Sequence, residues 1–479
     1  MPINSFLYPG ASGPATPYDV ANSVRLDGSS AYMTRTMGTP TNTDKYTFSF
    51  WVKRSKLGVQ QSIFRSTNGD ASNDSHVTFQ SDDTLRFEEY GGSSSVGKLQ
   101  TNQVFRDVTA WYHIVLVYDS GNSTAGNRMR MYVNGTEVTS FGTDNNPSSG
   151  ANSFFNKSGE SLHFGRTSYS GGANYFGGYL AEVVMCDGQA LDPTSFGEFD
   201  SDSPNIWKPI DVSGLTFGNN GFYLDFEDSG DLGDDESGNG NDFTETNLAA
   251  TDQCTDTCTN NFATLNPLVT YPSTPPVHSE GNLQVVTVNA DPGYFGSSST
   301  IGVTQGKWYA EFKPTNSTSG VPYLIGVSSD PAEMARNGAT SGNQYSSTEW
   351  GYYGHNGNQY HDGSNSSYGD AYTTNDIIGV ALDLDNHKLY FSKNGTFQNS
   401  GDPTSGSTGT GAISIDTGKT YFFILTDLGG AVCTYQANFG SPPFSISSGN
   451  SDANGYGNFE YSVPSGYYAL NTKNLAEYG

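Results

Sequence analysis

The sequence predicts an all-β protein made of two tandem antiparallel β-sandwiches behind a short extended N-terminal arm. The chain of 479 residues contains 58 Gly, 30 Tyr and 28 Phe, whereas charged residues make up only 15%. This composition favours short strands joined by tight turns. Apolar residues recur with period two in both halves, and helical periodicity is almost absent. The length allows two or three domains, each with a core of its own.

The clearest strand patterns lie in the first half. Residues 46–52 and 128–133 alternate apolar and polar positions, which suits a sheet with one solvated face. Residues 111–118 are nearly all apolar, as in a central strand. Asn134-Gly135 and Asn394-Gly395 each follow a strand pattern, and each predicts a hairpin turn.

Three segments are expected along the chain. Residues 1–20 are rich in Pro and Gly and predict an extended arm. Residues 21–275 form the first sandwich, and residues 276–479 form the second. The boundary is placed at a cluster of prolines, Pro272, Pro275 and Pro276.

The charge balance argues against two classes of partner. The chain has 22 Lys and Arg against 49 Asp and Glu, a formal net charge of −27. Nucleic acids and anionic membranes both bind clustered basic residues, so neither is expected as a partner. The N-terminus lacks the pattern of a secretion signal, and no apolar run approaches the roughly 20 residues that span a bilayer. We therefore expect synthesis in a cytoplasm and no membrane insertion.

Six segments of the first half recur together in one known family. They are SVRLDG at 23–28, FSFWV at 48–52, WYHIV at 111–115, MYVNG at 131–135, HFGR at 163–166 and GYLAEV at 178–183. Residues 23–184 thus resemble the laminin-G/concanavalin A-like family, whose fold is a two-sheet jelly roll. The turn DDESGNGND at 234–242 resembles a family segment that normally precedes the first sheet. Because it follows the last strand here, we expect residues 220–248 to fold back onto the first sandwich.

A second set of segments lies in the other half. They are GKWYAEF at 306–312, IGVS at 325–328, WGY at 350–352, DIIGVALDLD at 376–385, LYFSKNG at 389–395 and ANFG at 437–440. Residues 281–475 thus resemble the SPRY family, a β-sandwich that serves as a protein-interaction module in many settings.

The order of the two modules resembles that of marine bacteriophage proteins of the tail-fibre kind. The resemblance implies a non-enzymatic virion surface protein, either a tail fibre, a head fibre or a capsid decoration. It would mediate adhesion to the host surface or stabilise the particle. It would be made in the host cytoplasm and carried on the virion. The implied partners are other virion proteins through the arm, a host glycan or protein, and further copies of the chain, with a trimer as the expected oligomer.

A turn in the acidic part of the first half offers oxygen ligands for calcium, the one cofactor that the sequence suggests. Many laminin-G relatives bind calcium, and glycines would let the turn curl around an ion. In the alternative, which we favour, the Asn-Gly and Ser-Gly pairs build turns and the acids are solvated. The candidate ligands are Asp234, Asp235, Asn239, Asn241 and Asp242.

A free carbohydrate-binding lectin is the alternative function. Aromatic faces stack on sugars and amides bond their hydroxyl groups, and residues 350–360 (WGYYGHNGNQY) contain both. Trp350 matches a SPRY strand and is expected in the core. His113 and His163 lie within strand motifs and are expected to be structural. The candidate ligand-binding residues are Tyr353, His355, Tyr360 and His361.

A glycoside hydrolase of concanavalin-like fold is the least favoured function. Retaining hydrolysis needs two carboxyl groups about 5–5.5 Å apart. The nearest pattern, EFDSDS at 198–203, has Ser203 where laminarinase-type enzymes carry the acid/base glutamate. We therefore expect no enzyme activity.

The cysteines do not form a disulfide framework, because the chain has only four. Cys254 and Cys258 lie four positions apart, and the sequence leaves open a bond between them.

Overall fold

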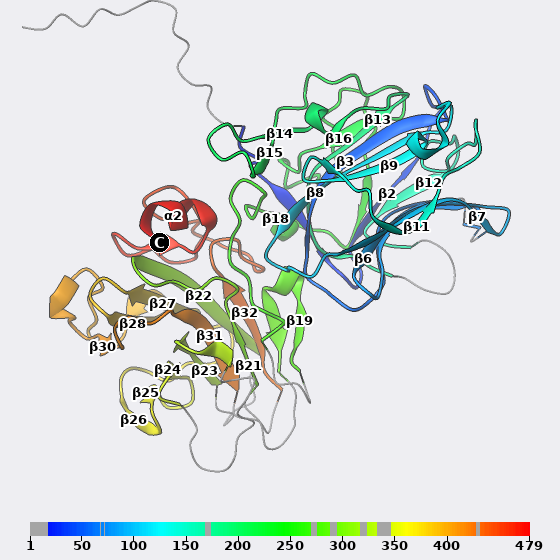
Figure 1. Cartoon of the computed structure of the whole chain (residues 1–479). Helices are drawn as coiled ribbons and strands as arrows, with labels where there is room; N and C mark the ends of the chain where they lie inside the picture. The colour runs from blue at the N-terminus through cyan, green and yellow to red at the C-terminus, as the bar shows by residue number, and fades with distance from the viewer. Residues whose placement is uncertain are drawn as a thin grey trace, which may run out of the picture.

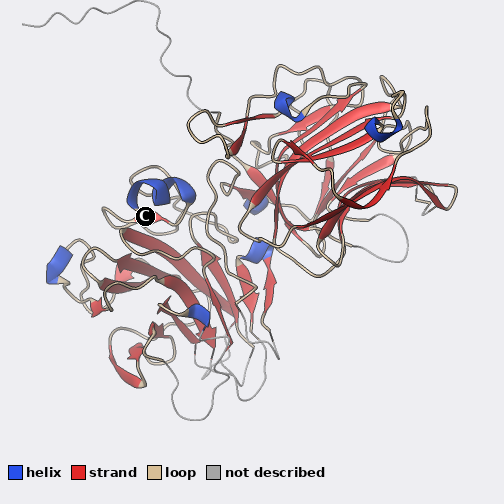
Figure 2. Ribbon diagram, viewed as in Figure 1, coloured by secondary structure: helices blue, strands red, loops and turns tan. Residues whose placement is uncertain are grey.

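The computed structural model describes residues 18–67, 69–70, 72–167, 174–269, 275–287, 295–316, 323–332, 346–427 and 432–479. These residues form two β-sandwiches that lie side by side, with the linker between them (Figure 1). Figure 2 shows that strands dominate both halves and that helices are few and short. The predicted fold class is confirmed.

The first sandwich consists of two eight-stranded sheets. In order, the first sheet contains β10 (Thr136–Glu137), β9 (Met129–Val133), β8 (Trp111–Asp119), β3 (Lys45–Arg54), β13 (Gly177–Asp187), β1 (Ser23–Asp27) and β18 (Gln253–Cys254), with β16 (Phe222–Leu224) on β13. The second, here called sheet B, contains β11 (Phe141–Asn145), β7 (Ser94–Val104), β6 (Thr84–Gly91), β5 (Asp74–Phe79), β4 (Gln61–Thr67), β12 (Ser161–Phe164), β2 (Tyr32–Thr36) and β17 (Thr244–Thr246). The strands β14 (Gly197–Phe199) and β15 (Trp207–Pro209) form a separate pair.

The segment that was expected to fold back, 220–248, contributes one strand to each of these sheets. Its first strand, β16, pairs with β13, and its last strand, β17, pairs with β2. Phe222 and Phe243 are buried in the core between the sheets, where their rings lie 4.9 Å apart. The segment therefore closes the core of the sandwich.

The second sandwich also consists of two sheets. One contains β19 (Val277–Ser279), β20 (Gln284–Val286), β32 (Thr434–Asn438), β22 (Lys307–Asn316), β27 (Ile378–Asp383), β28 (Lys388–Lys393) and β29 (Thr396–Phe397), with β30 (Ile413–Ser414) on β28 and β33 (Tyr468–Ala469) on β22. The other contains β21 (Phe295–Ser298), β31 (Phe422–Asp427), β23 (Tyr323–Ser328), β24 (Glu349–Tyr353), β25 (Asn358–His361) and β26 (Ser364–Ser367). Trp308, Trp350 and Phe423 lie in the core between the two sheets.

Short helical segments lie between the strands. The single-turn helices are η1 (Ala125–Asn127), η2 (Pro193–Ser195), η3 (Ala250–Asp252), η4 (Glu280–Asn282) and η5 (Gly406–Thr408). The sequence patterns did not predict α2 (Thr472–Tyr478), which begins at Asn471, where the side chain accepts a hydrogen bond from the Asn474 amide. None of the helices in the described ranges is long and apolar enough to cross a membrane.

A buried ion pair holds the linker against the first sandwich. The Lys53 ammonium on β3 lies 2.7 Å from the Asp256 carboxylate, and both side chains are 1% exposed. Lys53 also donates to Asn261 and to the Phe262 carbonyl, while Asp256 accepts from the Trp111 indole. Because every charged group in this cluster has polar partners, the desolvation cost of the pair is offset.

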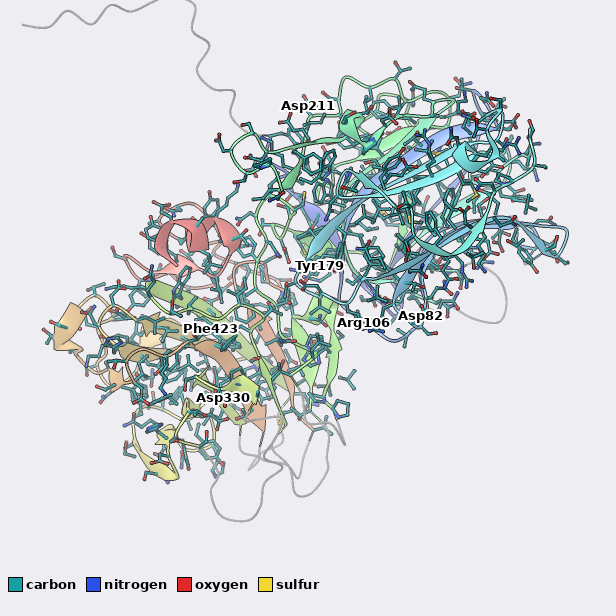
Figure 3. The ribbon with its side chains drawn as sticks, in the orientation of Figure 1. Asp82, Arg106, Tyr179, Asp211, Asp330 and Phe423 are labelled. Carbon is teal, nitrogen blue, oxygen red and sulfur yellow. The ribbon has the colours of Figure 1, made fainter. Side chains whose placement is uncertain are left out.

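Direct contacts also cross between the sandwiches. The Arg25 guanidinium on β1 is 1% exposed and donates to the Pro442 carbonyl of the second sandwich at 3.3 Å. Tyr179, which lies near the junction in Figure 3, donates its hydroxyl to the Gly281 carbonyl at 2.9 Å. A Cβ at Gly281 would lie 2.2 Å from this hydroxyl oxygen, so the contact requires glycine. These contacts fix the two sandwiches against each other.

The described strands and cores show where each sandwich takes its residues near the junction, which the sequence placed at residue 275. The first sandwich ends at Cys254, the last residue of β18. Ala263 and Leu265 already pack in the core of the second sandwich. The boundary at residue 275 stays a prediction.

The bond left open between Cys254 and Cys258 is not formed, because both cysteines are free. The Cys254 sulfur lies 3.5 Å from Arg25, which donates to it. Burial raises the pKa of Cys254 to about 11, so the thiol is neutral at physiological pH.

The end of the arm is held by a buried carboxyl group on β13. Glu182 lies at an irregularity of β13, where its φ of 50° places it in the left-handed region. Its carboxylate accepts from the hydroxyls of Tyr18 at 3.0 Å and Tyr223 at 2.9 Å. Burial, with smaller contributions from Asp225 and Glu227, raises the pKa of Glu182 to about 7.

The Glu182 carboxyl should make stability depend on pH between about 4.5 and 7. The folded-state pKa of Glu182 lies above the ordinary value of 4.5. The stability that this group contributes is therefore fully present below pH 4.5 and is lost as the pH rises through 7. Glu182→Gln removes this titration. Between pH 4.5 and pH 8, the free energy of unfolding of the variant should rise by on the order of 3 kcal/mol relative to that of the wild type. Thermal unfolding across this range measures the difference, with the exposed Glu137→Gln as control. A difference between variant and wild type that does not change with pH would contradict the assignment.

Candidate binding sites

The candidate ligand-binding residues of the second sandwich fall into two groups. Tyr353 and Tyr360 meet edge to face, with ring centroids 5.0 Å apart, and His355 lies 6.0 Å from Tyr353. His361 instead stacks on the buried Trp350 at 4.4 Å, and its Nδ1 lies 2.9 Å from the Glu349 carbonyl. Three of the four residues are therefore brought together, and a packing role accounts for His361.

The backbone of β24 makes room for this aromatic group. Tyr360 lies opposite Gly351 in the pairing of β25 with β24, and it packs against Leu324 and Ile424. A Cβ at Gly351 would lie 2.1 Å from the Leu324 side chain. Because Tyr353 is buried, only Tyr360 and His355 offer appreciable surface to a ligand. Ligand binding by this group stays a prediction.

The side chains proposed as calcium ligands are occupied within their own turn. The Asp235 carboxylate accepts from the amides of Tyr223, Ser237 and Asn241. The Asn239 and Asn241 amide groups both donate to the Gly221 carbonyl, and Asp242 accepts from the Asp235 amide. Asp234 is partly exposed. In the described ranges, no three His, Cys, Asp or Glu side chains gather in a way that could hold a metal ion. Calcium binding here stays a prediction. The hydrogen bonds by themselves explain how these side chains stabilise the turn.

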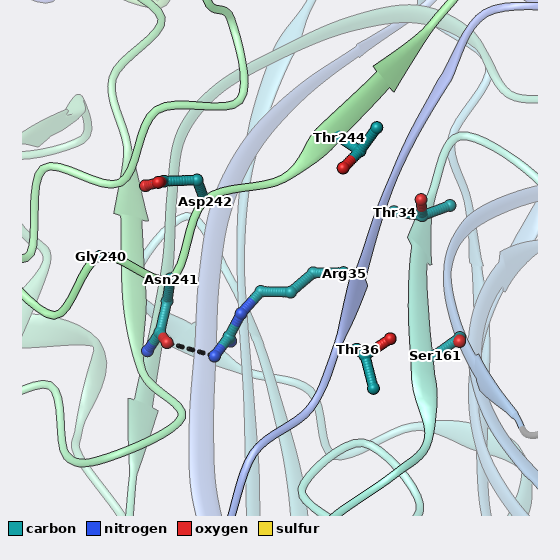
Figure 4. A pocket seen from close by; sticks show the side chains of 8 residues that line it. All are labelled: Thr34, Arg35, Thr36, Ser161, Gly240, Asn241, Asp242 and Thr244. Carbon is teal, nitrogen blue, oxygen red and sulfur yellow. Dashed lines mark hydrogen bonds between the residues drawn. The ribbon is translucent and has the colours of Figure 1, made fainter.

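A polar pocket opens beside this turn, at the edge of sheet B (Figure 4). Its volume is about 450 Å³. The Arg35 guanidinium extends toward Asn241 and donates to its side-chain oxygen. The hydroxyl groups of Thr34, Thr36, Ser161 and Thr244 line the pocket, together with the Asp242 carboxylate. Several hydroxyl groups around one pocket suit a ligand that is itself rich in hydroxyl groups.

Sequence reasoning missed this pocket. Its residues come from 34–36, 161 and 240–244, and only the folded-back segment brings them together. Alternating threonines at Thr34 and Thr36 were the one signal in the sequence, and alternation alone does not indicate a site.

The nearest hydrolase pattern forms a surface turn. Glu198 and Asp200 both pair with Lys208, at 3.2 and 3.4 Å, on the isolated strand pair β14–β15. Asp200 also accepts from the amides of Asp202 and Ser203. The glutamate is 58% exposed, so the group lacks the enclosed pair of carboxyls that glycoside hydrolysis uses.

The two histidines of the first sandwich that were expected to be structural, His113 and His163, differ in their surroundings. His113 is buried between Ser49 and the Trp207 indole, which donates to its Nδ1, and burial lowers its pKa to about 3. His163 lies on the outer side of sheet B, and its Nδ1 is buried with no hydrogen-bond partner among the described residues. Burial and then two nearby arginines, Arg166 and Arg65, lower the pKa of His163 to about 4.

The domains found in this chain are of kinds that suggest a binding or adhesion role. Residues 27–194 match the family model described as the concanavalin A-like lectin/glucanases superfamily, and residues 307–412 match the SPRY domain. A concanavalin A-like domain and a SPRY domain are thus found in tandem, and both are domains of the binding kind.

Two solved structures are similar to part of this chain. The SPRY domain of human HERC1 shares 16% identity with a TM-score of 0.29, over 36% of this chain and 96% of that one. The heptameric SAP-like pentraxin of Limulus polyphemus shares 20% identity with a TM-score of 0.28, over 36% of this chain and 79% of that one. Comparison with curated proteins gives no match.

Proposed function

We propose that the chain is a non-enzymatic adhesion protein on the surface of a bacteriophage virion, carried as a tail fibre, a head fibre or a capsid decoration. The observation that carries the proposal is the tandem of two domains of the binding kind, joined through buried contacts. The phage origin rests on the resemblance of this domain order to tail-fibre proteins. A role in stabilising the particle belongs to the same proposal.

The arm gives the proposal a way to attach the chain to a particle. Residues 1–17, most of the arm, lie outside the described residues. At the described end, Tyr18 is held by Glu182, the Val20 amide donates to Thr259, and Asp19 pairs with Lys473 of α2 at 2.5 Å. An arm that starts from so firmly held a point would transmit attachment directly to both sandwiches. Contact with other virion proteins through the arm, and a trimeric state, remain parts of the proposal.

Mass spectrometry of purified particles tests the location. Particles released from infected host cells should contain the chain in amounts comparable with known minor virion proteins. An antibody against the second sandwich should label their surface in electron micrographs. Particles that lack the chain after gradient purification, while the infected lysate contains it, would contradict the proposal.

A free carbohydrate-binding lectin is the second candidate, and the hydroxyl-lined pocket at the edge of sheet B favours it. A glycan array discriminates between the two. A free lectin would bind defined glycans and be absent from particles. Loss of that binding in Tyr360→Ala, but not in Tyr456→Ala, would place the sugar on the second sandwich.

A further inference from the structure

The register of sheet B aligns polar side chains in one row across six strands. Thr34 lies opposite His163, His163 opposite Arg65, and Arg65 opposite His76. His76 in turn lies opposite Glu88, and Glu88 opposite Lys98. Side chains opposite each other on one face of a sheet are about 5 Å apart, so the row is continuous.

This row lies on the outer face of the sandwich. Neighbouring positions on the same strands point into the core, and they are apolar: Met33, Phe164, Phe64, Val77, Phe87 and Leu99. Because successive side chains of a strand alternate between faces, the polar row points away from that core.

Charges on this face run opposite to the charge of the whole chain. Asp74 pairs with Arg65 and, at 2.7 Å, with His76. Glu88 lies 3.3 Å from His76, 3.5 Å from Arg86 and 3.7 Å from Lys98. The Arg166 guanidinium lies over the Tyr32 ring, 4.2 Å from its centre. Four Arg and Lys side chains therefore accompany Asp74 and Glu88 on this face, and Asp242 adds a third carboxylate in the pocket at its edge, on a chain whose formal net charge is −27.

His163 leaves a buried nitrogen on this face without a hydrogen bond among the described residues. The His163 Nδ1 is buried and unbonded, beside the cations of Arg166 and Arg65. His163 also lies next to Thr34 and Ser161, which line the hydroxyl pocket at the edge of the sheet. A ligand that carried both hydroxyl groups and negative charges would satisfy the pocket and the cationic group together.

We propose that the outer face of sheet B binds an acidic polysaccharide, a sugar chain bearing carboxylate or sulfate groups. The sugar chain would run from the hydroxyl pocket past Arg166 and His163 to Arg86 and Lys98, whose side chains are 23% and 21% exposed. Arg65 is buried and pairs with Asp74, so it contributes charge beneath this path. The inference rests on the proposed adhesion function and gives it a ligand class. A net negative protein needs such a local reversal of charge to hold an anionic ligand, since its overall field repels one.

The test measures binding of the full chain to three polymers by biolayer interferometry: alginate, which carries carboxylates, dextran sulfate, and neutral dextran. Wild type should bind at least one acidic polymer, with an affinity that falls as salt rises, and should bind neutral dextran far more weakly. Which acidic polymer binds tells which anion the face recognises.

Arg166→Glu should weaken this binding by about tenfold or more, because it removes a charge-assisted contact and adds repulsion. Lys419→Glu makes the same change of charge at an exposed site on the second sandwich and should leave binding unchanged. Thermal unfolding shows whether each variant is folded. If the Arg166→Glu variant does not fold, Lys98→Ala on the same face is measured in its place.

Three results would overturn the inference: no binding to either acidic polymer, equal loss in Arg166→Glu and Lys419→Glu, or tighter binding to single-stranded DNA than to any polysaccharide. Its failure is distinct from failure of the proposed function. Particles that contain a chain unable to bind acidic polymers would leave the virion role intact and remove only the ligand. If the chain bound acidic polymers but was absent from particles, the ligand would stand and the virion role would be wrong.

Discussion

Replacing Asp256 with alanine should destabilise the chain by about 3–5 kcal/mol, because it leaves the Lys53 ammonium buried without its counter-charge. Lys53 and Asp256 are each 1% exposed, so water cannot take the place of the lost partner. The substitution also removes the acceptor for the Trp111 indole and the Phe262 amide. Denaturant unfolding, followed by tryptophan fluorescence, measures the loss.

The matched control is Asp416→Ala, at an exposed carboxylate, which should change stability by less than about 0.5 kcal/mol. The double variant Lys53→Met/Asp256→Ala should recover part of the loss, since it removes the stranded charge as well. A cost below about 1 kcal/mol for Asp256→Ala would show that the junction is held by other contacts. The same conclusion would follow if the stability lost in the double variant equalled the sum of the losses in the two single variants.

Phe222→Ala should cost about 3–5 kcal/mol, as truncation of a buried aromatic ring usually does. Phe222 is fully buried, and its ring lies 4.9 Å from Phe243, 5.7 Å from Phe164 and 6.1 Å from Phe48. It therefore ties the folded-back segment to strands of both sheets. Calorimetric unfolding should show a lower midpoint for the first sandwich.

Phe199→Ala is the control, since that ring is 46% exposed and should cost under about 1 kcal/mol. Deleting residues 215–250 should lower the midpoint of the first sandwich further than Phe222→Ala does. An unchanged midpoint after the deletion would show that the segment only covers the sandwich and does not complete its core.

Much of the fold follows from local patterns in the sequence. Period-two alternation at 46–52 and 128–133 predicted β3 and β9, and Trp350 lies in the core as its strand motif indicated. Both Asn-Gly pairs adopt left-handed backbone angles, as hairpin turns require. These features are decided by neighbours in the chain, so one sequence is enough to reveal them.

Contacts between distant residues could not be predicted in this way. Lys53 and Asp256 lie 203 positions apart, and nothing near either residue indicates the other. The polar row on sheet B depends on the register of six strands, and a shift by one residue would move each side chain to the other face. Helix α2 was missed because seven residues are too few to show a helical period.

The most direct test of the central claim, that the chain is an adhesion protein, is binding of the purified, fluorescently labelled chain to intact host cells. We expect saturable binding that unlabelled chain displaces and that leaves the bound surface polymer uncut, with no release of reducing sugar. Cells that take up no more labelled chain than labelled albumin, or that release sugar in proportion to added chain, would contradict it.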